Sequence, residues 1–108
     1  MQVLDRILCA CGAYEQKFYF NNRFDNIPEA VKEELQVMCV MFTEDVGGEI
    51  YVSFDEDGTL LLTVNADEDD ILYDEIGSGL KINELRRKKA ELFEQLEAYY
   101  RSFILKMR

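Results

Sequence analysis

A predicted β-hairpin near the middle of the chain constrains the fold most. Apolar residues occupy alternate positions in residues 49–55 and again in residues 59–65, which is typical of two half-buried strands. They are Ile50, Val52, Phe54, Leu60, Leu62 and Val64. The turn Asp55-Glu56-Asp57-Gly58 ends in a glycine that can adopt the left-handed backbone of a tight turn. Tyr51 and Leu61 make the other face of the hairpin unusually apolar, so we expect something to cover it.

A second, shorter hairpin is predicted near the N-terminus. Residues 7–11 form an apolar run before Gly12, and Lys17-Phe18-Tyr19-Phe20 predicts the next strand. The spacing of apolar residues in 3–11 also fits one face of a helix, which remains the alternative for this stretch.

Residues 28–46 predict a helix, with Pro28 in its first turn and Gly47-Gly48 at its end. Its main apolar stripe comprises Val31, Leu35, Met38, Cys39, Phe42 and Val46. Val37, Val40 and Met41 widen this stripe until the helix is apolar on nearly all sides. We therefore expect a central helix that is covered on more than one side.

The C-terminal part of the chain predicts a short helix and a long one. The acidic run at 67–70 is typical of a helix start, and this short helix is expected to end at Gly77. The long helix is expected over residues 80–107, with favourable ion pairs Glu84–Lys88 and Glu97–Arg101. The chain of 108 residues is thus expected to form a single α+β domain over 1–108. It would comprise two β-hairpins in a small antiparallel sheet, a buried central helix, a short helix and a long C-terminal helix.

The residue types argue against an enzyme. The sequence contains no histidine, so every catalytic or metal site that depends on an imidazole is excluded. Gly77-Ser78-Gly79 lacks the spacing of a nucleophile elbow, and no phosphate-binding loop ending in Gly-Lys-Ser/Thr occurs. We expect no catalytic residue and no cofactor.

The cysteines indicate a reducing compartment. Cys9, Cys11 and Cys39 are odd in number, and the two-residue separation of the first pair suits a disulfide poorly. Three thiolates are also too few for a structural zinc site. We expect small buried thiols in a cytoplasmic protein.

The acidic segments 55–57 and 67–70 could suggest a divalent cation. A twelve-residue calcium loop needs glycine at its sixth position, where Leu60 or Leu72 stands. We expect solvated carboxylates and no metal site. A Mg²⁺-dependent hydrolase using Asp67, Asp69 or Asp70 is the least favoured functional alternative.

Charge is distributed unevenly along the chain. The sequence has 22 acidic and 12 basic residues, a net charge of −10, which argues against a nucleic-acid partner. Residues 1–80 hold 18 acids and 4 bases, whereas residues 81–108 hold 4 acids and 8 bases. We expect the basic cluster Arg86-Arg87-Lys88-Lys89 to lie against the acidic remainder, in the same or a neighbouring subunit. The apolar run at 37–42 is too short to cross a bilayer, so no membrane partner is expected.

The end of the last helix predicts an interface. Apolar side chains point in all directions there, and a helix of about 25 residues would extend roughly 37 Å, beyond a compact body of this size. The expected interface residues are Tyr99, Tyr100, Phe103, Ile104 and Met107. We expect them to pair with a second copy in a homodimer. The alternative is a monomer whose first hairpin wraps this end.

The chain resembles a bacterial family of small acidic cytosolic proteins, a domain of unknown function. The resemblance lies in residues 34–48, 57–61 and 67–77, together with the basic stretch at 81–89. It implies no activity and no functional residues.

We expect a non-catalytic protein–protein interaction module, of adaptor or chaperone type, whose protein partner is unknown. The main alternative is an acidic inhibitor or immunity-type protein that masks a cationic site.

Overall fold

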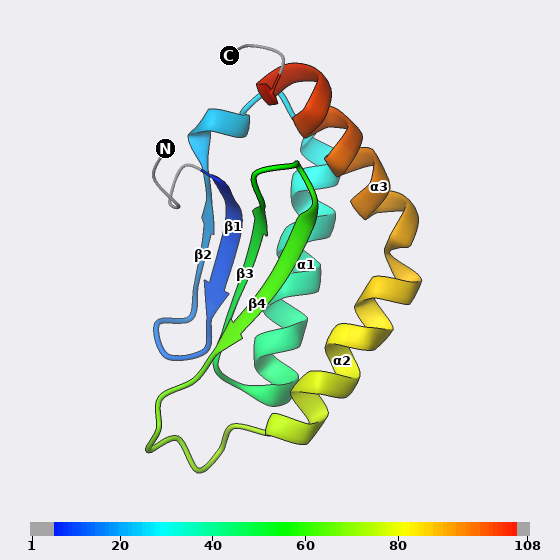
Figure 1. The fold of residues 1–108 in the computed structure, drawn as a ribbon. Helices are drawn as coiled ribbons and strands as arrows, with labels where there is room; N and C mark the ends of the chain where they lie inside the picture. The colour runs from blue at the N-terminus through cyan, green and yellow to red at the C-terminus, as the bar shows by residue number, and fades with distance from the viewer. Residues whose placement is uncertain (1–5, 106–108) are drawn as a thin grey trace.

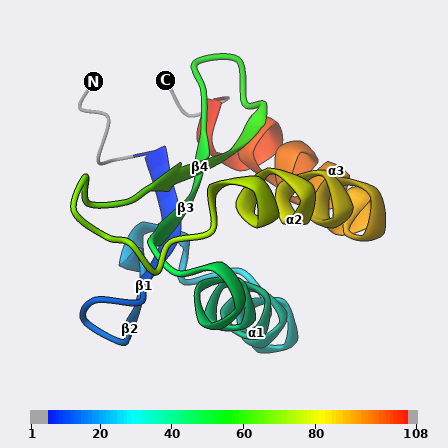
Figure 2. The same ribbon diagram turned by 90° about the horizontal axis from the view of Figure 1, so that it is seen from below.

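A computed structural model describes residues 6–105 of the chain (Figure 1). It contains an antiparallel sheet with strand order β2-β1-β3-β4, and its α-helices all lie on one side of that sheet (Figures 1 and 2). The strands are β1 Ile7–Gly12, β2 Lys17–Phe20, β3 Glu49–Phe54 and β4 Leu60–Asn65. The helices are α1 Glu29–Val46, α2 Glu75–Lys88 and α3 Ala90–Tyr99, with a 3₁₀ helix η2 Asn22–Phe24 and a π-helix η3 Tyr100–Ile104. The expected α+β class is confirmed.

Both predicted hairpins form, and they join through β1 and β3. Cys9 pairs with Val52, and Cys11 pairs with Ile50, across this junction. Residues 7–12 are therefore a strand, and the helical alternative for them is wrong; residues 3–5 lie outside the described part. At the tip of the second hairpin, Gly58 adopts the left-handed conformation that the sequence predicts, with φ +86°.

The helix α1 packs one face on the sheet and leaves the opposite face open. Leu35, Cys39 and Phe42 are almost fully buried against the strands. In contrast, Val37 and Met41 are each 57% exposed. The sheet covers one face of α1 and α2 covers a flank, so the helix is covered on more than one side as expected, but this cover does not reach Val37 and Met41 (Figure 2).

The three cysteines are free and buried, as the sequence predicts. Cys9 of β1 lies against Cys39 on the buried face of α1. A hydrogen bond with Cys39 and burial raise the pKa of Cys9 well above its ordinary value of 9.0. Cys11 lies beside Thr43, with 3.6 Å between sulfur and hydroxyl oxygen.

The predicted short helix over 67–77 is wrong. Residues 67–74 form turns, and α2 begins at Glu75 and continues through Gly77. The physical reason is the position of the cap: the Asp74 carboxylate accepts a hydrogen bond from the Gly77 backbone N–H at 2.8 Å. Asp70 instead binds within the loop, where its carboxylate accepts from the Leu72 N–H at 3.0 Å and the Tyr14 hydroxyl at 2.7 Å.

The predicted long helix over 80–107 is interrupted at Lys89, and its residues 106 and 107 lie outside the described part. Lys89 has φ −106° and ψ 16°, so the chain changes direction between α2 and α3. This bend places Leu92, Phe93 and Leu96 of α3 in the core. The Cα radius of gyration is 13.9 Å, close to the roughly 13 Å expected for a compact chain of this length. The C-terminal helix therefore follows the body of the protein.

One of the two predicted helical ion pairs forms. Lys88 donates to Glu84 at 3.1 Å, and this contact holds the pKa of Glu84 below its ordinary value. The predicted Glu97–Arg101 pair is wrong. The Glu97 carboxylate instead accepts from the backbone N–H of Leu60 at 2.8 Å, and Arg101 donates to the carbonyl of Asp57 at 2.9 Å.

Candidate functional site

The expected C-terminal interface is largely covered by the chain itself. Tyr100 is only 1% exposed, and its ring stacks on Phe54 at the end of β3. The ring centroid of Phe24, in η2, lies 6.3 Å from that of Tyr100. Tyr100 is thus a core residue and is not available to a partner, because η2 and the second hairpin supply the apolar cover that a second copy was expected to give.

The other expected interface residues differ in exposure. Tyr99 is half-buried, and its hydroxyl donates to the side-chain oxygen of Asn26 at 2.5 Å. Burial raises the pKa of Tyr99 above its ordinary value. Ile104 packs partly against the core, whereas Phe103 is 55% exposed, with its ring centroid 5.4 Å from that of Tyr99. Met107 lies outside the described residues.

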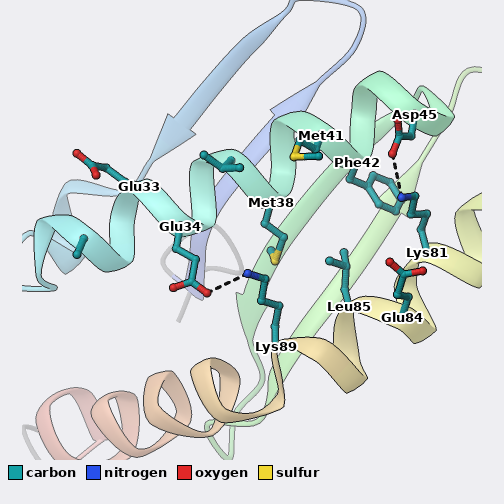
Figure 3. A pocket seen from close by; sticks show the side chains of 12 residues that line it. Glu33, Glu34, Met38, Met41, Phe42, Asp45, Lys81, Glu84, Leu85 and Lys89 are labelled. Atoms are coloured by element: carbon teal, nitrogen blue, oxygen red, sulfur yellow. Dashed lines mark hydrogen bonds and ion pairs between the residues drawn. The ribbon is translucent and has the colours of Figure 1, made fainter.

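A groove between α1 and α2 is the clearest candidate binding site (Figure 3). It has a volume of about 460 Å³. Its apolar lining comprises Ala30, Val37, Met38, Met41, Phe42 and Leu85. Its charged lining comprises Glu33, Glu34, Asp45, Lys81, Glu84 and Lys89. The groove therefore combines an apolar floor with a charged rim.

Two ion pairs cross the groove and join α1 to α2 and to Lys89, the residue that directly follows α2 (Figure 3). Lys81 binds Asp45 at 2.9 Å near one end, and Lys89 binds Glu34 at 3.0 Å near the other. The hydrogen bond with Asp45 raises the pKa of Lys81 above its ordinary value. Of the expected basic cluster at 86–89, Lys89 therefore lies against the acidic part of the same chain, whereas Lys88 pairs with Glu84 of its own helix. Lys81, which also contacts the acidic part, lies outside that cluster.

The groove is not apparent from the sequence, although Val37 and Met41 of its lining stand out there as apolar residues outside the main stripe of α1. Their position on the helix indicates that some neighbour should cover them, but periodicity does not say which neighbour or whether it belongs to the same chain.

The acidic loop 67–70 does not gather ligands for a cation. Asp70 is occupied by Tyr14 and Leu72, and the side chains of Asp67 and Asp69 are exposed. Within residues 6–105, no group of three or more Cys, Asp or Glu side chains lies close enough to hold a metal ion. In the same range, no helix has the length and apolar character needed to cross a membrane.

Comparison with known proteins gives a family and no activity. Neither the curated proteins nor the solved structures include a match to this chain. The family model described as "Family of unknown function (DUF6145)" matches residues 5–108, nearly the whole chain. The expected resemblance to a domain of unknown function is confirmed, and the chain belongs to the DUF6145 family.

Proposed function

We propose that this protein is a non-catalytic module that binds another protein through the groove between α1 and α2. The observation that supports this most strongly is the exposure of Val37 and Met41, 57% each, within the apolar lining of the groove. Burying a side chain of this size stabilises a complex by up to about 1.5–3 kcal/mol. A partner that covers both residues therefore gains a substantial part of its binding free energy from them.

The shape of the groove suits an α-helix. The two helices are linked by ion pairs at the edge of the groove and form a trough between them, and amphipathic helices bind such troughs with their apolar face. Met38 and Met41 contribute flexible, polarisable side chains to the lining, which can adjust to helices of different sequence. This combination favours recognition of an apolar face over recognition of one fixed sequence.

The charge of the surroundings favours a basic partner. Four carboxylates and two lysines lie on the rim, which leaves an excess of negative charge there, and the chain as a whole has a net charge of −10. Basic residues that flank the apolar face of a bound helix would be attracted to this surface and would accelerate association. A second copy of α1 would instead bring Glu29, Glu33 and Glu34 against like charges. We therefore favour a different, basic protein as the occupant of the groove.

A peptide selection tests this proposal, because random peptides take the place of the unidentified partner. Random 16-residue peptides on phage would be selected against the wild-type protein, the double variant Val37→Asp/Met41→Asp, and the control Leu61→Asp. Leu61 is 38% exposed on the face of the sheet away from the helices. Thermal unfolding of each variant confirms that it is folded.

The expected result is one family of selected peptides. Wild type and Leu61→Asp should enrich sequences with apolar residues at i, i+3, i+4 and i+7 and with flanking Lys or Arg, and the double variant should not. Absence of such peptides, or their equal enrichment on the double variant, would contradict the proposal.

The net charge of −10 also supports the alternative of an acidic inhibitor that masks a cationic site. The two proposals differ in their response to salt. Binding driven mainly by charge weakens steeply between about 50 and about 500 mM salt, whereas binding to the apolar groove persists. A partner lost completely at the higher salt concentration would favour the inhibitor.

Self-association through the C-terminal end is a separate proposal. The exposed ring of Phe103 beside Tyr99 supports it. Sedimentation of the wild type and Phe103→Ser decides it: a wild-type dimer that the substitution dissociates supports the proposal, and a monomer in both contradicts it. We also propose a cytoplasmic location, which the three free thiols support.

A further inference from the structure

The face of the sheet turned away from the helices holds a second candidate site, formed by Tyr19 and Tyr51. The helices cover only the opposite face (Figures 1 and 2). The pairing of the strands places Tyr19 of β2 and Tyr51 of β3 on either side of Ala10 in β1. Phe18, whose side chain packs against the core, confirms that its neighbour Tyr19 points outward.

The two tyrosines are the walls of a shallow pocket of about 400 Å³. Adjacent strands lie about 4.8 Å apart, so the Cα atoms of Tyr19 and Tyr51 are separated by roughly 10 Å across β1. A flat group stacked between two rings needs about 7 Å between them, at ordinary contact distances of about 3.5 Å. Ala10 and Gly12 form a low floor that leaves this space open.

Two carboxylates mark one end of the pocket. Glu49 lies over Gly12, where its Cγ is 3.3 Å from the position that a Cβ would occupy. Glu49 also accepts a hydrogen bond from the Tyr51 hydroxyl at 3.4 Å. Glu15, from the β1–β2 turn, also lines the pocket. Burial, followed by the charges of Glu49 and Glu15, raises the pKa of Tyr51.

Lys17, a cation that also lines the pocket, leaves the carboxylates of Glu49 and Glu15 available. Lys17 lies in register with Gly12 at the pocket edge, but it makes no ion pair within residues 6–105. The pocket thus offers two aromatic faces and two carboxylates to an incoming cation, and its width suits a planar cation better than a round one.

We propose that this pocket binds an arginine side chain of a partner protein, with the guanidinium between the rings of Tyr19 and Tyr51 and beside the carboxylates of Glu49 and Glu15. Arginine stacks on aromatic faces and donates several hydrogen bonds to carboxylates, whereas the ammonium of lysine is compact and more strongly hydrated. This site lies on the opposite side of the molecule from the groove between α1 and α2 and does not depend on it.

The test is an NMR titration of the ¹⁵N-labelled full chain with two capped tripeptides, Gly-Arg-Gly and Gly-Lys-Gly. We expect the arginine peptide to shift the amide signals of Ala10 and Gly12 saturably and to bind more tightly than the lysine peptide. Tyr19→Ala and Tyr51→Ala should each weaken binding roughly two- to fivefold. Tyr51→Phe, which keeps the ring, should bind nearly as well as wild type.

Two further variants complete the design. Leu61→Ala lies on the same open face away from the pocket and should bind like wild type. Lys17→Gln removes a competing cation and should strengthen binding. Equal binding of the two peptides, an absence of shifts at Ala10 and Gly12, or unchanged affinity in both tyrosine-to-alanine variants would overturn the proposal.

Discussion

The ring of Tyr100 stacks on the ring of Phe54, with centroids 4.3 Å apart and planes inclined by 19°. This contact joins the π-helix η3 near the C-terminus to the end of β3 and closes one end of the core. It explains why the apolar turns at the end of the chain do not all require a second molecule.

The stacking predicts a large loss of stability in Tyr100→Ala. Removing a fully buried aromatic side chain costs about 3–5 kcal/mol in the free energy of unfolding. Phe103→Ala, three residues later and 55% exposed, is the matched control and should cost less than about 1 kcal/mol. Urea unfolding measures both; similar losses in the two variants would contradict the placement of Tyr100 in the core.

A second prediction concerns the hydrogen bond from the Leu60 N–H to Glu97. Leu60 is almost fully buried at the start of the edge strand β4, so its N–H has no ready access to water. Glu97→Ala should therefore lower the free energy of unfolding by about 1–3 kcal/mol. The exposed neighbour Glu94, changed to Ala, should have an effect within about 0.5 kcal/mol. Equal effects would argue against this contact.

The start of α2 gives a third prediction. Asp74→Ala removes the side chain that caps the Gly77 N–H and should cost about 0.5–2 kcal/mol. Asp69→Ala changes an exposed carboxylate in the preceding loop and should have little effect. Thermal unfolding compares the two; a larger loss for Asp69→Ala would place the start of the helix nearer the acidic run, as the sequence alone suggested.

The buried thiol of Cys9 predicts a pH dependence. Its pKa is raised in the folded state by the hydrogen bond with Cys39 and by burial, so the unfolded chain loses this proton at a lower pH than the folded chain. Stability from this group is therefore complete below the ordinary pKa of 9.0 and is lost as the pH rises above it.

Cys9→Ala tests this effect. Between about pH 8 and about pH 10.5, its free energy of unfolding should fall less steeply than that of the wild type, since both proteins share the same tyrosines. Chemical denaturation at each pH provides the comparison. Parallel curves would show that Cys9 does not contribute.

How much of the fold follows from the sequence depends on how local the determining interactions are. Both hairpins and α1 were predicted because alternation, a turn glycine and a flanking proline act within a few residues. The start of α2 was missed because two acidic positions compete for the role of cap. Asp74 takes it, and its carboxylate accepts the hydrogen bond from the Gly77 N–H.

The binding surfaces depended on long-range packing and were harder to predict. The bend at Lys89 places its ammonium beside Glu34, and no local sequence signal marks residue 89 as a helix end. The residues of the groove floor were identified as apolar, but the open side of α1 becomes visible only when α2 is placed beside it. The pocket at Tyr19 and Tyr51 likewise requires the register of β2, β1 and β3.

The most direct test of the groove as a binding site uses the methyl signals of Met38 and Met41. Protein labelled with ¹³C at the methionine methyl groups would be titrated with an 18-residue helical peptide of Leu, Ala and Lys, apolar on one face and basic beside it. We predict saturable shifts of both signals in the wild type and in Leu61→Asp, and their loss in Val37→Asp. A peptide that fails to bind, or binds while the signals of Met38 and Met41 stay unchanged, would contradict the proposal.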